Sequence, residues 1–173
     1  SFGTLYLAQA IADFMLAYPD LRIEAIMNDR FIDPLEEGVD VTVRIGVLQD
    51  SSLIARKLAP ARRVLVASSA YLKSHGIPAT PADLADHRAL NFGHASGQQR
   101  WQLQDGDDVV SVPIDAALCS NNGDVLRAAA LNGNGITLLP TFMVGPDIAA
   151  GRLSIVLPDH PPVGLGIYAL YAP

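Results

Sequence analysis

The stretch LRIEAIMNDRFIDPLEEGVDVTVRIG, residues 21–46, decides the fold class. Apolar and polar residues alternate over Leu21–Ile26, which is typical of a half-exposed β-strand. A short helix is expected over Pro34–Glu37, and the β-branched run Val39–Ile45 predicts a second strand. Strand, helix and strand in this order favour an α/β sheet over a helical bundle or a β-sandwich.

Helices and strands continue to alternate outside this stretch. Apolar residues recur at three- and four-residue spacing from Leu7 to Tyr18, which predicts a helix that Pro19 ends. Pro60 lies in the β-like run that begins at Leu53, and it predicts a break between two strands. Further strands are expected over 53–58, 63–67, 136–139, 153–157 and 167–171, further helices over 69–75, 81–85 and 125–131, and a β-hairpin over 101–112.

The composition excludes several classes of protein. Half of the 173 residues are hydrophobic and 17% are charged, which favours a packed core over disorder. The net charge of −6 argues against duplex DNA binding by these residues. Cys119 is the one cysteine, so no intramolecular disulfide can form. No apolar run is long enough for a transmembrane helix, and the first residues lack the basic region of a signal peptide.

No motif for catalysis, nucleotide binding or metal binding is found. Gly133-Asn134-Gly135 comes after a helix and before a strand, so it predicts a helix C-cap and not a phosphate loop. The segment Gly93–Gly97 holds a serine and a histidine without the spacing of a nucleophile elbow. The acidic turn Asp105–Asp108 lacks the downstream glutamate of a calcium loop, and the four histidines show no zinc spacing. The sequence therefore predicts no enzyme activity, no metal and no cofactor.

Polar and aromatic residues do gather where predicted strands lead into helices, which is where open α/β sheets bind ligands. Each has a purely structural alternative: Arg44 can pair with Asp40 or Asp50, and Asn122 can simply cap a helix. As a set they predict a binding site for a small, anionic molecule, since a guanidinium and a helix N-terminus both favour anions. The set comprises Ser1-Phe2-Gly3, Arg44-Ile45-Gly46, Asn91-Phe92-Gly93-His94 and Ser120-Asn121-Asn122.

Several segments resemble the effector-binding domain of LysR-type transcriptional regulators, and together they span nearly the whole chain in the family's order. They are EEGVD at 36–40, VRIG at 43–46, SAYLKSHG at 69–76, TPADLA at 80–85, AAALNGNGITLLP at 128–140 and AGRL at 150–153.

The resemblance implies a two-lobed, periplasmic-binding-protein-like (type 2) α/β fold with two crossover segments. Lobe I would comprise residues 1–67 plus 170–173 and lobe II residues 68–169, with crossings near Ala67-Ser68 and Tyr168–Leu170. It further implies a cytoplasmic homo-oligomer, a dimer or tetramer, that binds DNA only through an N-terminal helix-turn-helix domain, which is not among these residues. The family's first strand and last helix are not among them either.

The resemblance also places a small-molecule effector in the cleft between the lobes. The helix Tyr6–Tyr18 would pack against Val125–Asn132 of a second copy, the alternative being that each helix only covers its own sheet. A periplasmic solute-binding protein of a transporter is the alternative function, and an α/β enzyme is a third. The implied effector-binding residues are Ser1, Phe2, Asn28, Arg30, Arg44, Ile45, Gly46, Phe92, Gly93, His94, Asn121, Asn122, Thr141 and Phe142.

Overall fold

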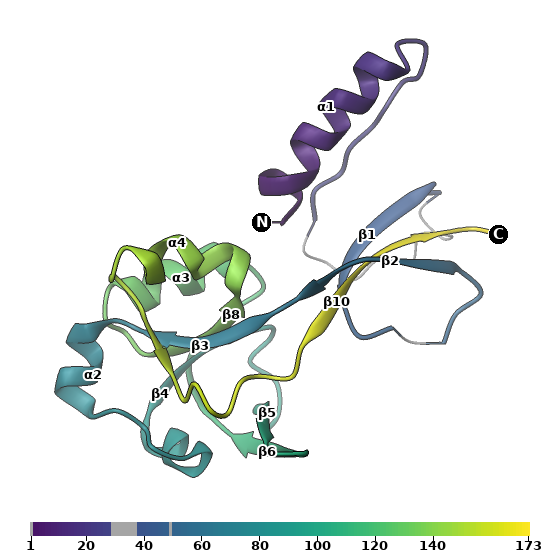
Figure 1. Cartoon of the computed structure of the whole chain (residues 1–173). Helices are drawn as coiled ribbons and strands as arrows, with labels where there is room; N and C mark the ends of the chain where they lie inside the picture. Colours follow the sequence, from purple (N-terminus) through teal and green to yellow (C-terminus); the bar gives the residue numbers. More distant parts are fainter. Residues whose placement is uncertain (1, 29–37, 49) are drawn as a thin grey trace.

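The computed structural model describes residues 2–28, 38–48 and 50–173, and it divides the strands between two main sheets (Figure 1). Separate sheets confirm the expectation of a two-lobed α/β fold. Ser1, Arg30 and the helix expected over Pro34–Glu37 lie outside the described residues.

The first lobe contains a three-stranded antiparallel sheet in the order β1-β10-β2. Its strands are β1 (Val41–Gly46), β2 (Ile54–Ala61) and β10 (Leu165–Tyr171). The chain begins with a π-helical turn, Gly3–Leu7, that continues into α1 (Ala8–Ala17). The predicted first helix is therefore confirmed, but α1 buries none of its residues.

The second lobe contains a five-stranded mixed sheet in the order β7-β4-β8-β3-β9. Strand β4 is parallel to both β7 and β8, whereas β3 is antiparallel to β8 and β9. The strands are β3 (Arg63–Ala67), β4 (Arg88–Phe92), β7 (Asp115–Ser120), β8 (Ile136–Pro140) and β9 (Ser154–Val156). The predicted hairpin is confirmed as β5 (Arg100–Asp105) and β6 (Asp108–Pro113).

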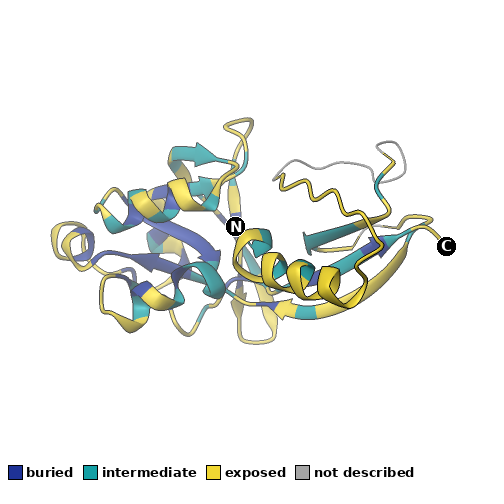
Figure 2. Ribbon diagram, turned by 90° about the horizontal axis from the view of Figure 1, so that it is seen from above, coloured by how far each residue is buried: buried dark blue, intermediate teal, exposed yellow. Residues whose placement is uncertain are grey.

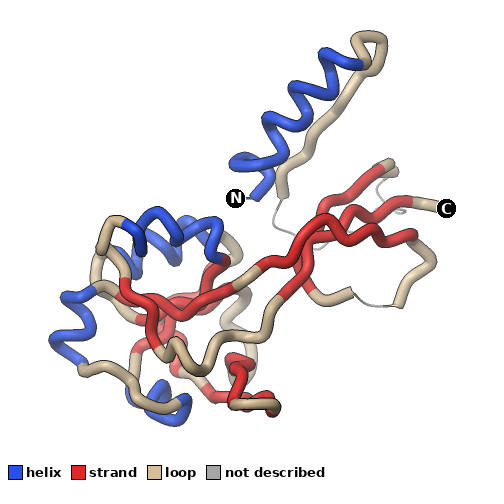
Figure 3. The backbone as a smooth tube through the Cα atoms, in the orientation of Figure 1, coloured by secondary structure: helices blue, strands red, loops and turns tan. Residues whose placement is uncertain are grey.

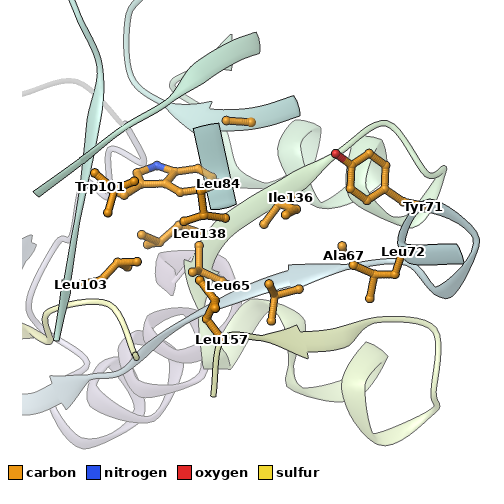
Figure 4. Close-up of a cluster of buried hydrophobic side chains, with 13 residues drawn as sticks. Leu65, Ala67, Tyr71, Leu72, Leu84, Trp101, Leu103, Ile136, Leu138 and Leu157 are labelled. Carbon is orange, nitrogen blue, oxygen red and sulfur yellow. The ribbon is translucent and has the colours of Figure 1, made fainter. Parts of the chain in front are cut away.

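Both faces of the five-stranded sheet are covered, and most of the buried residues lie there (Figure 2). Helices α3 (Gly123–Leu131) and α4 (Thr141–Ala149) cover one face, where Val66 meets Leu126 and Val144. On the other face α2 (Ser69–His75), a 3-10 turn (Pro81–Asp86) and the hairpin enclose a second cluster, centred on Leu65 (Figure 4). Neighbouring residues of β3 thus point into different halves of the core.

The chain passes from the first sheet to the second at Arg62 and returns through residues 157–164. Strand β3 pairs only with strands of the second sheet, and all of β10 pairs with strands of the first. Judged by sheet membership, the chain changes sheets shortly before each of the crossings expected near Ala67-Ser68 and Tyr168–Leu170. Strand β3 is apolar on both faces, which is typical of a strand inside a sheet covered on both sides.

The predicted strand Leu21–Ile26 is not a strand in the structure, although its chain is drawn as an extended loop beside α1 (Figure 3). A strand requires a hydrogen-bonded neighbour, and β1 pairs with β10 alone among the described residues. The side chains of Leu21, Ile23 and Ile26 are exposed as a result. Alternation in a sequence predicts a strand's faces but does not supply its partner.

Two further predictions are corrected at proline residues. Strand β2 runs through Pro60 to Ala61 without a break, because β2 is the edge of its sheet and an edge strand tolerates proline. No helix was expected after Pro140, yet this segment forms α4 with Pro146 inside it. Asp147 explains this helix: its side chain is fully buried and binds Arg127 of α3.

Candidate functional site

The carboxyl ends of three strands of the second sheet lie at one edge, which here means the side where the strands end and not an outer strand. Because β4 is parallel to β7 and to β8, the three strands end on the same side, at Phe92, Ser120 and Pro140. Pro140 pairs with Arg63, where the first crossing enters this sheet. The Thr141 N–H donates to the Arg62 carbonyl at 2.9 Å, which fixes the start of α4 beside the crossing. This edge therefore faces the first lobe.

An aromatic cluster joins the two lobes at this edge. The ring of Phe142, in the first turn of α4, lies 5.4 Å from the ring of Phe2 and 5.9 Å from that of Tyr6, both edge-on. Phe2 and Tyr6 stack on each other at 5.2 Å. The structure thus brings together Phe2 and Phe142 from the predicted set and adds Tyr6, which was assigned only to a helix surface.

The loop after β4 contains Phe92, Gly93 and His94. Phe92 is half exposed, and Gly93 adopts a φ of 125° that an L-residue side chain disfavours. The Gly93 N–H donates to the Ser120 carbonyl at 2.9 Å, so the loop is attached to the end of β7. The His94 carbonyl accepts a hydrogen bond of 2.7 Å from Gln99 Nε2.

A network of side-chain hydrogen bonds connects the base of this loop to the residues at the start of β5. Trp101 Nε1 donates to Asn91 Oδ1 at 2.9 Å, and Asn91 Nδ2 donates to Gln99 Oε1 at 2.7 Å. Gln99 also lies 3.3 Å from the sulfur of Cys119. The indole N–H can only donate, so it fixes which end of the Asn91 amide faces each partner. Neither Gln99 nor Trp101 was predicted as a site residue: Trp101 was expected only as the start of a hairpin, Gln99 lies just before it, and no pattern in the sequence indicates their hydrogen-bond partners.

The residues Asn121 and Asn122 lie at the same edge, before α3. The side-chain oxygen of Asn122 accepts the N–H groups of Asp124 at 2.9 Å and Val125 at 3.3 Å, which is the capping alternative noted above. Asn121 is exposed beside it. A Cβ on Gly123 would lie 2.6 Å from Met143 Cε of α4, so glycine lets the N-termini of α3 and α4 approach closely.

The remaining predicted residues lie on the first lobe. Arg44, Ile45 and Gly46 end β1, where they pair with Tyr168, Ile167 and Gly166 of β10. Partial burial lowers the pKa of the Arg44 guanidinium, which remains a cation at neutral pH. Asn28 is exposed at the end of the extended segment after α1.

The described residues hold no group of three or more His, Cys, Asp or Glu side chains that could bind a metal ion. In the same residues no helix is long and apolar enough to cross a membrane. A surface hollow of about 540 Å³ lies over α3, lined by Ala128, Ala129, Leu131 and Asn132, and is separate from the sheet edge.

Comparison with known proteins assigns the class. Residues 1–173 match the family model of the LysR substrate binding domain. The chain belongs to this family, the effector-binding regulatory domain of LysR-type transcriptional regulators. The resemblance stated from sequence is thereby confirmed.

Individual relatives agree with this assignment. The chain is 37% identical over 170 residues to an uncharacterized HTH-type transcriptional regulator of Haemophilus influenzae, covering 98% of this chain and 59% of the relative. The full-length Vibrio cholerae virulence activator AphB matches with a TM-score of 0.83 and 32% identity, over 100% of this chain and 59% of AphB. CrgA of Neisseria meningitidis matches with a TM-score of 0.81 and 31% identity, over 99% and 58%. The chain thus spans little more than half the length of these relatives.

Proposed function

We propose that the edge of the second sheet and the facing end of β1 form a cleft that binds a small, anionic effector. The observation that carries the proposal is the convergence of three strand ends, two helix N-termini and the first crossing at one edge. Phe2 and Phe142 reach this edge from different lobes, so a ligand bound beside them would contact both lobes at once. A ligand that binds one arrangement of the lobes more tightly shifts the equilibrium toward it.

The chemistry of the predicted residues supports an anion. Arg44 supplies a guanidinium at the carboxyl end of β1, and a guanidinium binds a carboxylate through two parallel hydrogen bonds. The α3 N-terminus near Asn121 and Asn122 adds a favourable dipole. Phe2, Phe92 and Phe142 supply apolar walls, and the loop Phe92–His94 supplies main-chain groups.

The proposal is tested by thermal-shift and calorimetric titration of the whole chain with a panel of small carboxylates, benzoate and succinate among them. The best binder is then titrated into Arg44→Ala. Losing a hydrogen bond to a charged group weakens binding by roughly tenfold or more. Arg56→Ala is the matched control, because Arg56 is exposed on β2 of the same sheet. An affinity for that carboxylate that Arg44→Ala leaves unchanged would remove Arg44 from the site.

The proposal extends to assembly and compartment. It assigns DNA binding to a separate helix-turn-helix domain, and it assigns this chain no enzyme activity and no cofactor. The protein works in the cytoplasm as a dimer or tetramer, in which α1 packs against α3 of a second copy. The exposed Val125 and the hollow over Ala128 and Ala129 support this contact. Because the curated relatives are transcriptional regulators, the alternative of a transporter's solute-binding protein is not favoured.

The sheet memberships support a different division into lobes from the one expected. In this proposal the boundaries fall at Arg62 and within residues 157–164, and the lobes rotate about these two segments.

A further inference from the structure

Strand β5 contacts the candidate site at one end and the return crossing, residues 157–164, at the other. At the site end, Gln99 and Trp101 hold Asn91 and the His94 carbonyl through the side-chain network described above. At the far end two backbone hydrogen bonds and the side chain of His160, whose Nδ1 lies 3.2 Å from the Gln104 carbonyl oxygen, make the contacts. The Gln104 N–H donates to the Pro161 carbonyl at 2.8 Å, and the Val163 N–H donates to the Gln102 carbonyl at 3.0 Å.

The same return segment is held on its other side by the first crossing. Arg63 donates from Nε at 3.2 Å and from a terminal nitrogen at 2.6 Å, both to the Val163 carbonyl. Within the described part of the chain, no carboxylate lies at ion-pair distance from Arg63. Val163 therefore links β5 through its N–H and the first crossing through its carbonyl, and the two crossings meet at this residue.

The return segment also has space in which to move. A hollow of about 120 Å³ is lined by Pro161 and Pro162 on one side and by Val64 and Leu65 of β3 on the other. Pro161 and Pro162 have no N–H to donate, so the bridge between Leu103 and Pro162, which consists of the hydrogen bonds from Gln104 to Pro161 and from Val163 to Gln102, attaches this part of the segment to β5. The hollow leaves the prolines incompletely packed against β3.

We propose that β5 couples the candidate site to the hinge between the lobes. A ligand that moves the Phe92–His94 loop pulls on Asn91 and Gln99, and β5 then shifts along its length. Because Val163 is bound to β5, this shift changes the angle at which the chain leaves the second lobe toward β10. Gln104 lies five positions after Gln99 in extended chain, a span of about 17 Å. The proposal deepens the effector-binding function and rests on it, but the coupling itself is a property of the chain without ligand.

Hydrogen exchange of the ligand-free chain tests the coupling. Trp101→Phe removes the indole donor, and Asn91→Ala removes its acceptor without opening a cavity under the hairpin. Both variants are expected to raise the exchange rates of the Val163 and Gln104 amides by roughly tenfold. Losing one net hydrogen bond changes the equilibrium for local opening by up to about this factor. Ser111→Ala is the control: the Ser111 hydroxyl binds the side chains of Arg100 and Gln102 on the same hairpin, not the Gln102 carbonyl that accepts from Val163 and not the Asn91 and Gln99 side chains.

Coupling must act equally in the other direction. Arg63→Met releases the Val163 carbonyl and is expected to raise exchange of the Ile114 amide, which donates to the Gln99 carbonyl at the site end. Amides of β8, the central strand, report global unfolding. The proposal is overturned if Val163 and Ile114 exchange rises no more than that of β8, or if Ser111→Ala reproduces the effect. Because no ligand is added, these results are independent of whether any carboxylate binds.

Discussion

The phenolic oxygen of Tyr71 lies 3.0 Å from Nδ1 of His87 and accepts the Arg88 N–H at the same distance. The hydroxyl can accept from Arg88 and still donate its own proton, so it donates to Nδ1 when that nitrogen is unprotonated. Burial of the ring, and then the neighbouring His75, lower the pKa of His87, whereas Asp86 and Asp83 act in the opposite direction. His87 is thus a neutral imidazole that joins α2 to the start of β4.

The first prediction concerns pH. The unfolded chain takes up a proton at His87 near the ordinary value of about 6.5, and the folded chain only at lower pH. The contribution of His87 to stability is therefore complete above about pH 6.5 and is lost as the pH falls from there toward the folded pKa. Urea unfolding between pH 7.5 and 5 measures this loss.

His87→Gln is expected to flatten that dependence, because glutamine does not titrate. The pKa values of Asp83 and Asp147 are also lowered, by backbone N–H groups and by Arg127 respectively, so their contributions are lost only at more acidic pH. They leave the window from 7.5 to 5 to His87. An unchanged slope in His87→Gln would contradict the assignment.

The second prediction concerns Asp147. Its buried carboxylate receives hydrogen bonds from Arg127 and from Arg152, whose contacts with Oδ1 are 3.0 and 2.8 Å. Arg127→Met leaves the carboxylate with one partner and is expected to lower the free energy of unfolding by about 1–2 kcal/mol, less than for a fully buried pair because Arg127 is partly exposed. Chemical denaturation measures it.

Arg152→Met serves as the comparison, since Arg152 is more exposed than Arg127. It is expected to cost less than Arg127→Met. Equal stabilities of both variants and the unchanged chain would show that the buried carboxylate is satisfied without either arginine.

The third prediction uses two glycines. A Cβ at Gly135 would lie 2.5 Å from the Arg88 carbonyl oxygen, so Gly135→Ala must separate the backbones of β4 and β8. We expect a loss of about 1–3 kcal/mol in the free energy of unfolding. Gly145→Ala in α4 meets nothing within 4 Å and is expected to stabilise by about 0.5–1 kcal/mol. Differential scanning calorimetry of the pair checks the opposite signs.

The fourth prediction concerns self-association. Ala129→Arg places a long cation in the hollow over α3 and is expected to convert the proposed dimer to a monomer in analytical ultracentrifugation. Lys73→Glu on α2 is a control of changed charge on another helix of the same lobe. A chain that is monomeric at micromolar concentration before any substitution would count against the α1–α3 contact.

Helices and strands could be predicted from the sequence wherever the signals that form them lie within the segment itself. Helix α3 has its Asn122 cap and the glycine after its end, and the hairpin has its Asp105–Asp108 turn. Pairing depends on segments far away, and this is where prediction failed. Leu21–Ile26 has the alternation of a strand but no partner among the described residues, and β3 pairs with β8 and β9, which come about 70 to 90 residues later in the chain.

The residues of the candidate site were named on different grounds. Their positions at a strand end and before the first helix indicated Phe92 and Phe2, and the family resemblance indicated Phe142. The support of the site was not predictable, because Trp101 and Asn91 are joined by a hydrogen bond across two different sheets. Helix α4 was not predicted, because Pro146 lowers the helix propensity of its sequence while the buried pairing of Asp147 with Arg127 stabilises it.

The position of β10 determines the order in which the lobes can be made during synthesis. The five-stranded sheet uses residues 63–156 alone, so every one of its strands is available before β10 is translated. The three-stranded sheet has β10 at its centre, and β1 and β2 do not pair with each other. Strand β1 must therefore wait for β10, a contact of high sequence separation that forms slowly. The five-stranded sheet can form on the ribosome before the three-stranded sheet is complete.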